Sequence, residues 1–255
     1  MAKKTGISWT DSTFNPWIGC TKVSPGCDHC YAGALMDTRW GQVRWGNGQE
    51  RRRTRPSNWR QPLVWNREGD AFASVHGGRR RRVFCASLAD VFDPEVPDAW
   101  RQDLWALIDQ TRHLDWLILT KRIGNAQRRR PPKGWPEHLW LGATIVNDEE
   151  YQRDLPKLLK IPAAFHWISV EPMLGPINTL GYDFPRLDWV VCGGESGAGA
   201  RPIQRAWIDQ LRRDCEQWNV PFFFKQWGGL RAGGDALLDG VEVKAWPSSP
   251  TELPF

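Results

Sequence analysis

The sequence has no apolar run that approaches the roughly 20 residues a helix needs to cross a bilayer. Its first residues, Met1 to Gly6, lead into polar and aromatic residues and lack the apolar core of a secretory leader. No internal repeat and no coiled-coil heptad stands out. We therefore expect a cytoplasmic protein with no membrane partner.

The cysteines do not form the pattern of a disulfide framework. Of the 6 cysteines among 255 residues, three are crowded into one loop, whereas Cys85, Cys192 and Cys215 are scattered. This usage favours a reducing compartment. With 41% hydrophobic residues the chain can bury a substantial core, and we expect one enzyme-sized domain over residues 1–230.

The crowded cysteines are the most informative feature of the chain. Cys20, Cys27 and Cys30 have the spacing C-x6-C-x2-C, and a Pro-Gly pair before the second cysteine turns the backbone sharply. No fourth ligand follows at zinc-finger distance. Three thiolates favour a [4Fe–4S] cluster with one open iron. A structural zinc completed by His29 and three unmetallated thiols are the alternatives.

The sequence Cys-x-x-Cys-Tyr-Ala resembles the cluster loop of the radical S-adenosylmethionine superfamily, although the usual spacing there is C-x3-C-x2-C. Through residues 14–21 (FNPWIGCT) the chain also resembles a phage- and prophage-associated family of three-cysteine proteins. The resemblance implies that a reduced [4Fe–4S] cluster on Cys20, Cys27 and Cys30 cleaves S-adenosylmethionine to a 5′-deoxyadenosyl radical. It also implies an electron donor and leaves open whether a partner protein presents the target.

The chain after about residue 82 repeats a short apolar run, a polar loop and a helical segment. The runs are continuous rather than alternating, which is typical of buried parallel strands. With one strand ahead of Cys20 they make seven: the others are at 83–87, 116–120, 139–144, 165–170, 189–193 and 221–225. We predict an α/β fold with a partial parallel (β/α) barrel, (β/α)6-like with an added strand. A fuller barrel and an open doubly wound sheet are the alternatives.

Polar side chains follow these strands, where the active site of such a barrel lies. Asp90, Lys121 and Cys192 are the catalytic candidates, although Cys192 by default is a small buried hydrophobe. Ser169 and Glu171 are candidates for the cofactor pocket. A helix cap is an equal alternative to a site role for Ser87, Thr144 and Asn147.

The run Gly193-Gly194-Glu195 is a further candidate cofactor contact. In the superfamily that the chain resembles, a Gly-Gly-Glu run after the second strand contacts the amino group of the cofactor, whereas here the run follows a late strand. Small residues let a ligand approach the backbone, and a carboxylate neutralises an ammonium group. Glu171 competes with Glu195 for this role, and the glycine-rich run fits a sugar or phosphate equally well.

Arginine is concentrated in three blocks, although the net charge is only +5. The blocks lie within residues 51–55, 79–82 and 128–130, and Trp40, Trp45, Trp59 and Trp65 lie around the first two. Arginine suits phosphate and aromatic faces suit bases, so nucleic acid is the predicted partner. The alternative is that the arginines lie on solvated faces and the tryptophans pack in the core. We expect a basic insertion over residues 41–78 and a C-terminal tail over 231–255.

The cluster loop and the basic insertion together predict a radical enzyme that acts on DNA or RNA, in repair or base modification. One alternative is a non-enzymatic nucleic-acid-binding protein with structural zinc. The other is a radical enzyme that acts on a small molecule or peptide. Metal analysis separates the radical enzyme from the zinc protein, because the first contains iron and acid-labile sulfide and the second contains zinc. Salt-dependent binding to oligonucleotides would argue against a small-molecule or peptide substrate.

Overall fold

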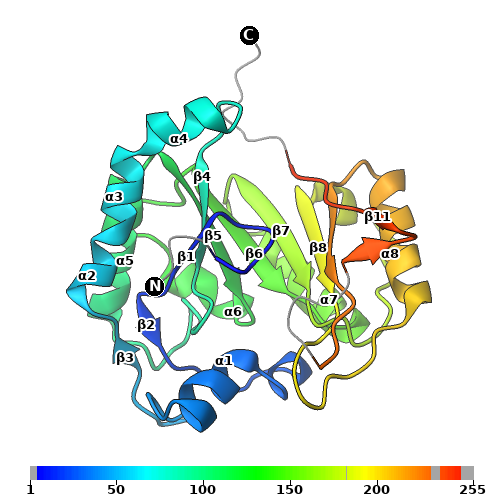
Figure 1. Cartoon of the computed structure of the whole chain (residues 1–255), viewed down its shortest axis with the longest axis horizontal. Helices are drawn as coiled ribbons and strands as arrows, with labels where there is room; N and C mark the ends of the chain where they lie inside the picture. The colour runs from blue at the N-terminus through cyan, green and yellow to red at the C-terminus, as the bar shows by residue number, and fades with distance from the viewer. Residues whose placement is uncertain (1–4, 182, 231–235, 248–255) are drawn as a thin grey trace.

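The computed structural model describes residues 5–181, 183–230 and 236–247. Seven parallel strands in the order β1-β4-β5-β6-β7-β8-β9 curl into a half-barrel (Figure 1). The partial parallel barrel predicted from the apolar runs is therefore confirmed. The strands are β1 (Ser12–Phe14), β4 (Arg81–Cys85), β5 (Leu114–Thr120), β6 (Leu139–Thr144), β7 (Phe165–Val170), β8 (Trp189–Gly193) and β9 (Phe222–Gln226).

Helical segments connect consecutive parallel strands. Helix α7 illustrates how the sequence starts them: Asn147 caps it by accepting from the backbone N–H of Glu150 at 3.0 Å, and acidic residues fill its first turn, where the helix dipole favours them. Asn147 therefore caps a helix, which is one of the two roles predicted for it. The connecting segments are α5 (Asp98–Gln110), α6 (Ile123–Ala126), η3 (Gln127–Arg129), α7 (Asp148–Leu159), η4 (Phe184–Arg186) and α8 (Arg205–Gln217).

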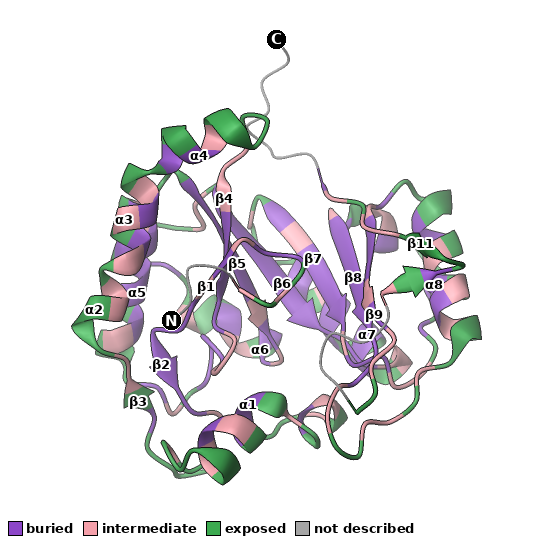
Figure 2. Cartoon of the chain, viewed as in Figure 1, coloured by how far each residue is buried: buried purple, intermediate pink, exposed green. Residues whose placement is uncertain are grey.

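The two faces of the sheet have different cores, because alternate side chains of a strand point to opposite sides. The helix-covered face packs aliphatic residues of α5, α7 and α8 against the strands. The concave face carries a cluster of aromatic rings, including Trp140, Trp167 and Trp189. Gly142 makes room for this cluster, since a Cβ there would lie 2.3 Å from the Trp167 ring. The strands are accordingly buried along most of their length (Figure 2), and several tryptophans are core residues.

The segment predicted as an insertion contains a short strand and three helices beside the β1 edge of the sheet (Figure 1). Strand β3 pairs antiparallel with β2, which directly precedes the cysteine loop. The elements here are β2 (Trp17–Ile18), β3 (Arg52–Arg53), α2 (Pro56–Trp59), α3 (Gln61–Arg67) and α4 (Gly69–Val75).

The described part of the predicted tail packs on the barrel. Strands β10 (Leu237–Leu238) and β11 (Val241–Glu242) form a hairpin, and the ring of Trp246 stacks on Trp189 with centroids 5.0 Å apart. Residues 231–235 and 248–255 of that tail lie outside the described residues. Among the helices in the described ranges, none is long and apolar enough to span a membrane.

Candidate functional site

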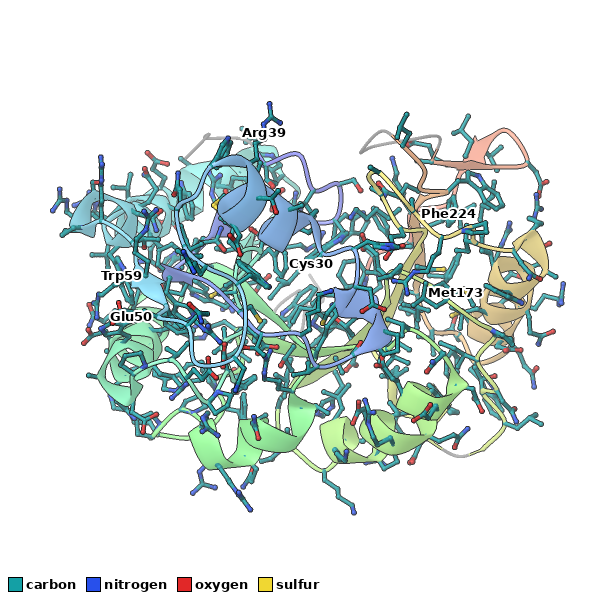
Figure 3. All side chains as sticks on the ribbon, turned by 90° about the horizontal axis from the view of Figure 1, so that it is seen from below. Cys30, Arg39, Glu50, Trp59, Met173 and Phe224 are labelled. Atoms are coloured by element: carbon teal, nitrogen blue, oxygen red, sulfur yellow. The ribbon has the colours of Figure 1, made fainter. Side chains whose placement is uncertain are left out.

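The cysteine loop lies at the carboxyl ends of the parallel strands. Gly19 pairs with Ala89 just beyond β4, and its N–H donates to the carbonyl of Leu88 at 3.1 Å. Viewed from below, Cys30 lies near the middle of the molecule (Figure 3). The sequence therefore brings the three cysteines to the edge of the sheet where a parallel barrel places its site.

The loop is shaped by tight local packing. Pro25–Cys27 forms a single turn, η1, in which the Ser24 hydroxyl accepts from the N–H of Gly26 at 3.0 Å. A Cβ on Gly26 would lie 2.7 Å from a methyl carbon of Val146, so the loop needs glycine at this point. Cys30 then precedes the helical segments α1 (Tyr31–Gly33) and η2 (Ala34–Arg39).

Arg122 ties Cys20 to the end of β5. Its Nη1 lies 3.2 Å from the Cys20 sulfur and 3.3 Å from Oδ2 of Asp90. Asp90 also accepts from the Thr120 hydroxyl and from the backbone N–H of Lys121. Burial, with a smaller effect of the Asp90 carboxylate, raises the pKa of the Cys20 thiol to about 12 although Arg122 opposes the shift. Asp90 thus organises the loops after β4 and β5.

Glu195 anchors the other end of the cysteine loop. Its carboxylate accepts from the guanidinium of Arg201, at 2.6 and 2.9 Å, and lies 2.8 Å from Nδ1 of His29. Arg201 also donates to the carbonyl of Pro25 at 2.9 Å. Although burial opposes ionisation, these hydrogen bonds lower the pKa of Glu195 to about 2. The loop after β8 is therefore tied to the cysteine loop on both sides of Cys27.

The two glycines before Glu195 meet another stretch of backbone. The N–H of Gly194 donates to the carbonyl of Gln226 at 2.9 Å, and a Cβ on Gly194 would lie 1.9 Å from the carbonyl oxygen of Trp227. Gly228 approaches equally closely, since its Cβ would lie 2.3 Å from the carbonyl oxygen of Glu195. Close packing of the exits of β8 and β9 accounts for these small residues.

The other predicted pocket residues lie on or just after β7 to β9. Glu171 forms an ion pair with Lys225 of β9. Ser169 is buried on β7. Cys192 is fully buried on β8, where its sulfur lies 3.7 Å from that of Met173, and burial raises the pKa of its thiol. Both candidate carboxylates for a cofactor amino group thus already hold a cation of this chain.

A cavity of about 840 Å³ lies beside the cysteine loop, and its lining includes Cys27, Cys30 and the stretch Ser196 to Ala198. Three thiols without a fourth ligand are donors that suit an iron–sulfur cluster. In the described residues no three His, Cys, Asp or Glu side chains are gathered round one point as metal ligands. The donor chemistry fits the group, while cluster binding would have to draw the three sulfurs together.

In two of the predicted basic blocks, some arginines form ion pairs within the protein. The Arg51 side chain is fully buried and lies 2.9 Å from Asp93. Arg79 forms a bidentate pair with Asp11, at 2.7 and 2.9 Å. Basic density in the sequence therefore overstates the number of arginines that face outward.

Sequence reasoning gave Arg201 and Lys225 no site role. Arg201 is the one arginine in a glycine- and alanine-rich stretch, and Lys225 is the one charge in an aromatic strand. A single cation among small or apolar residues usually has a partner, so the sequence could have indicated that Arg201 and Lys225 each pair with a carboxylate.

The fold and the site at the carboxyl edge of its sheet define an α/β half-barrel protein with a cysteine loop at the ends of its strands. The chain belongs to the DUF5131 family of proteins of unknown function, whose model matches residues 4–246. A search of curated proteins gives no match.

Two solved structures of spore photoproduct lyase variants are similar in fold. One, a cysteine-to-serine variant, has a TM-score of 0.46 and 12% identity over 84% of this chain and 75% of its own. The other, a double variant with bound AdoMet and dinucleoside spore photoproduct, has a TM-score of 0.42 and 12% identity over 81% of this chain and 60% of its own.

Proposed function

We propose that this protein is a radical S-adenosylmethionine enzyme that acts on nucleic acid, in repair or base modification. Cys20, Cys27 and Cys30 would hold a [4Fe–4S] cluster, which when bound supplies the electron for reductive cleavage of the cofactor. The observation that carries the proposal is the position of this three-cysteine loop at the carboxyl edge of the parallel sheet, where it contacts the segments after β4, β5 and β8.

The chain's own residues would hold the loop and shape the cofactor site. Arg122 donates to the Cys20 sulfur, and hydrogen bonds to cluster sulfurs tune reduction potentials. The stretch Ser196 to Ala198 lines the same cavity as Cys27 and Cys30, so a ligand that fills the cavity would contact both loops. Glu195 and Glu171 stay the two candidates for the cofactor's amino group. On binding the cofactor, the carboxylate would release its present partner, Arg201 or Lys225, and pair with the ammonium group instead.

Asp90 and Lys121 have supporting roles in this proposal. The Asp90 carboxylate is engaged by four donors around the β4 and β5 exits. The Lys121 side chain lies beside Gly26, with Cε 3.3 Å from where a Cβ would stand. Lys121 therefore contacts the cysteine loop itself, whereas Asp90 supports the loop through Arg122. Cys192 lies in the core with Met173, a position that suits packing more than hydrogen donation.

The test is anaerobic reconstitution with iron and sulfide, followed by electron paramagnetic resonance of the reduced protein with and without S-adenosylmethionine. We expect a [4Fe–4S]⁺ signal that changes when the cofactor is added, and formation of 5′-deoxyadenosine. Replacing Cys20, Cys27 and Cys30 by alanine should abolish the signal. Replacing the buried Cys215 by alanine is the matched control and should leave it intact.

Retention of zinc without a cluster signal would overturn the proposal in favour of a structural metal site. A cluster signal that ignores the cofactor would also contradict it, since the open iron is what binds the cofactor. Cofactor cleavage in a protein that binds no oligonucleotide would instead point to a small molecule or peptide as the substrate.

A further inference from the structure

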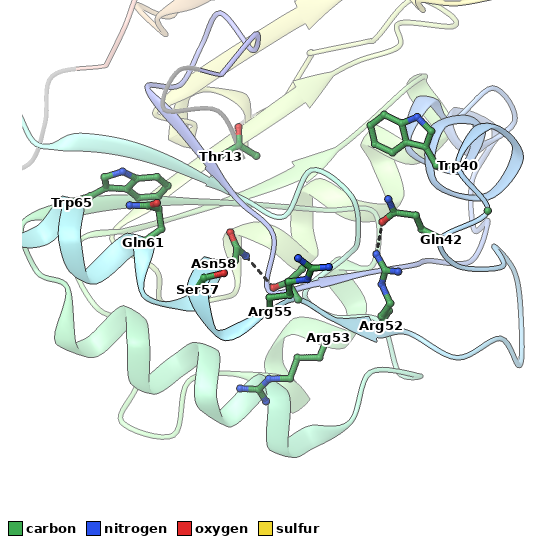
Figure 4. Close-up of a pocket in the computed structure, with 12 residues that line it drawn as sticks. Thr13, Trp40, Gln42, Arg52, Arg53, Arg55, Ser57, Asn58, Gln61 and Trp65 are labelled. Carbon is green, nitrogen blue, oxygen red and sulfur yellow. Dashed lines mark hydrogen bonds between the residues drawn. The ribbon is translucent and has the colours of Figure 1, made fainter.

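A second cavity, of about 770 Å³, opens beside the β1 edge of the half-barrel (Figure 4). Strand β3, helices α2 and α3 and the turn after η2 contribute to it. We call it the arginine pocket, because Arg52, Arg53 and Arg55 line it. Its volume lies within the usual range of ligand sites, about 300–1,000 Å³.

The arginine pocket is positively charged. Its lining includes three arginines and no aspartate or glutamate. Arg53 is neutralised by Asp103, 2.7 Å away. Arg52 and Arg55 are exposed, and within the described part of the chain neither forms an ion pair with a carboxylate; Arg52 donates only to the amide oxygen of Gln42. Two guanidinium groups are thus available to an anion from outside, unlike the paired Arg51.

The pocket also offers an aromatic face. Trp40 lies on its wall and is 52% exposed, an unusual state for so large an apolar side chain. An indole face beside free guanidinium groups suits a base stacked next to its phosphate. The buried tryptophans of the barrel interior have no such access.

Two amide side chains complete the lining, and hydrogen bonds fix the first of them. The Nδ2 of Asn58 donates to the Asn15 carbonyl at 2.8 Å and to the Thr54 hydroxyl at 2.9 Å. Since both its donors are used, Asn58 presents its amide oxygen as an acceptor. Gln61 lies on the same wall, one helix further along (Figure 4). Amide groups of this kind read the edge of a base.

The pocket is built from the segments that flank the cysteine loop. Arg52 pairs with Ile18, two residues before Cys20, and Trp40 ends the helical segment that starts just after Cys30. A strand held in the pocket would therefore be held by the same segments that position the cysteines. This arrangement links binding to the proposed site.

We infer that the arginine pocket binds a single nucleic-acid strand, with phosphates on Arg52 and Arg55 and a base against Trp40. The inference takes its substrate class from the proposed function and adds the surface that would hold it. A nucleic-acid strand fits better than a simple anion, because stacking and amide groups accompany the charge.

The test is fluorescence anisotropy with a labelled 12-nucleotide single-stranded DNA, the same sequence as RNA, and its duplex. We expect the wild type to bind either single strand more tightly than the duplex. Comparing the DNA and RNA affinities shows whether the pocket prefers deoxyribose or ribose. The variant Arg52→Ala/Arg55→Ala should bind at least tenfold more weakly. Its slope of log affinity against log salt should fall by about 1.4, since each phosphate contact on a single strand contributes about 0.7.

The matched control is Arg128→Ala/Arg130→Ala, which removes the same charge from two exposed arginines of another basic block. It should keep its affinity within about twofold. Trp40→Ala should lose about tenfold, whereas Trp40→Phe, which keeps an aromatic face, should recover most of the binding. Thermal melting of each variant shows whether a loss reflects unfolding.

Equal losses in the two double variants would overturn the assignment and leave only general attraction of a basic surface. Inorganic polyphosphate that binds as tightly as DNA, with Trp40→Ala unaffected, would overturn the base contact. The anisotropy assay measures binding without any cleavage of the cofactor. Pocket-dependent binding in a protein that cleaves no cofactor would therefore refute the proposed chemistry alone, and cleavage without pocket-dependent binding would refute the pocket alone.

Discussion

Arg122 and Cys20, 102 positions apart in the sequence, meet with Nη1 3.2 Å from Sγ. The same nitrogen lies 3.3 Å from Oδ2 of Asp90, and both ionic side chains are more than nine-tenths buried. A buried carboxylate that loses its cation is left uncompensated, which costs far more than the net value of the pair. Arg122 thus supports both the loop and the carboxylate.

We therefore predict that Arg122→Met lowers the free energy of unfolding by about 3 kcal/mol. Denaturant unfolding of the metal-free protein measures it. Arg112→Met is the control, because Arg112 is mostly exposed and its ion pair with Asp109 lies on the surface; it should cost less than about 0.5 kcal/mol. The double variant Asp90→Asn/Arg122→Met should recover part of the loss. Equal costs for the two single arginine variants would refute the prediction.

The glycine before Glu195 gives a second prediction. A Cβ on Gly194 would lie 1.9 Å from the carbonyl oxygen of Trp227, so Gly194→Ala must push apart the exits of β8 and β9. We expect a loss of about 2–3 kcal/mol in the free energy of unfolding. Gly124→Ala is the control, since a Cβ there meets nothing within 4 Å. It should be neutral or slightly stabilising in its helix. A neutral Gly194→Ala would mean that this contact is not close in solution.

The seven strands were predictable because parallel strands buried on both faces are continuous apolar runs. The run from Trp189 to Gly193 is entirely buried, and so are most residues of β5 and β6. The position of the cysteines also followed from the sequence, since strands of one direction bring their exits to one edge.

Which charges pair could not be predicted, because the partners are far apart in sequence. Arg79 and Asp11 are separated by 68 positions, and His29 and Glu195 by 166. Local composition therefore indicated an arginine-rich surface where the fold forms internal ion pairs. The same limit applies to the tryptophans: only the fold separates the exposed Trp40 from the core rings.

The six cysteines should differ in their reactivity with iodoacetamide. Cys85, Cys192 and Cys215 are fully buried, and burial raises the pKa of each thiol, so the native protein should leave them unmodified. Cys30, which is partly exposed, should react first in the metal-free protein. Peptide mass spectrometry gives the order.

Reconstitution with iron and sulfide should then protect Cys20, Cys27 and Cys30 together, because a bound thiolate no longer alkylates. Labelling in denaturant supplies the fully reactive reference. Modification of native Cys192 as fast as Cys30 would contradict its position in the core.

The contacts of Glu195 predict how stability depends on pH. The pKa of this carboxyl is about 2 in the folded chain, against a usual value of 4.5, so the folded state favours the ionised form. Its contribution is fully present above about pH 4.5 and is lost as the pH falls towards 2. Glu195→Gln should cost roughly 1–3 kcal/mol at neutral pH. The difference between wild type and variant in unfolding free energy should vanish near pH 2.

Glu242→Gln is the control, because Glu242 is exposed on β11 and pairs only with Lys244 in the described structure. Its effect on unfolding free energy should stay small throughout the range. Loss of the Glu195 anchor should also release the cysteine loop, since Arg201 and His29 both bind this carboxylate. Faster alkylation of Cys27 and Cys30 in Glu195→Gln at pH 7 would show that release. An unchanged rate would mean that the contacts with Leu88 and Arg122 hold the loop without it.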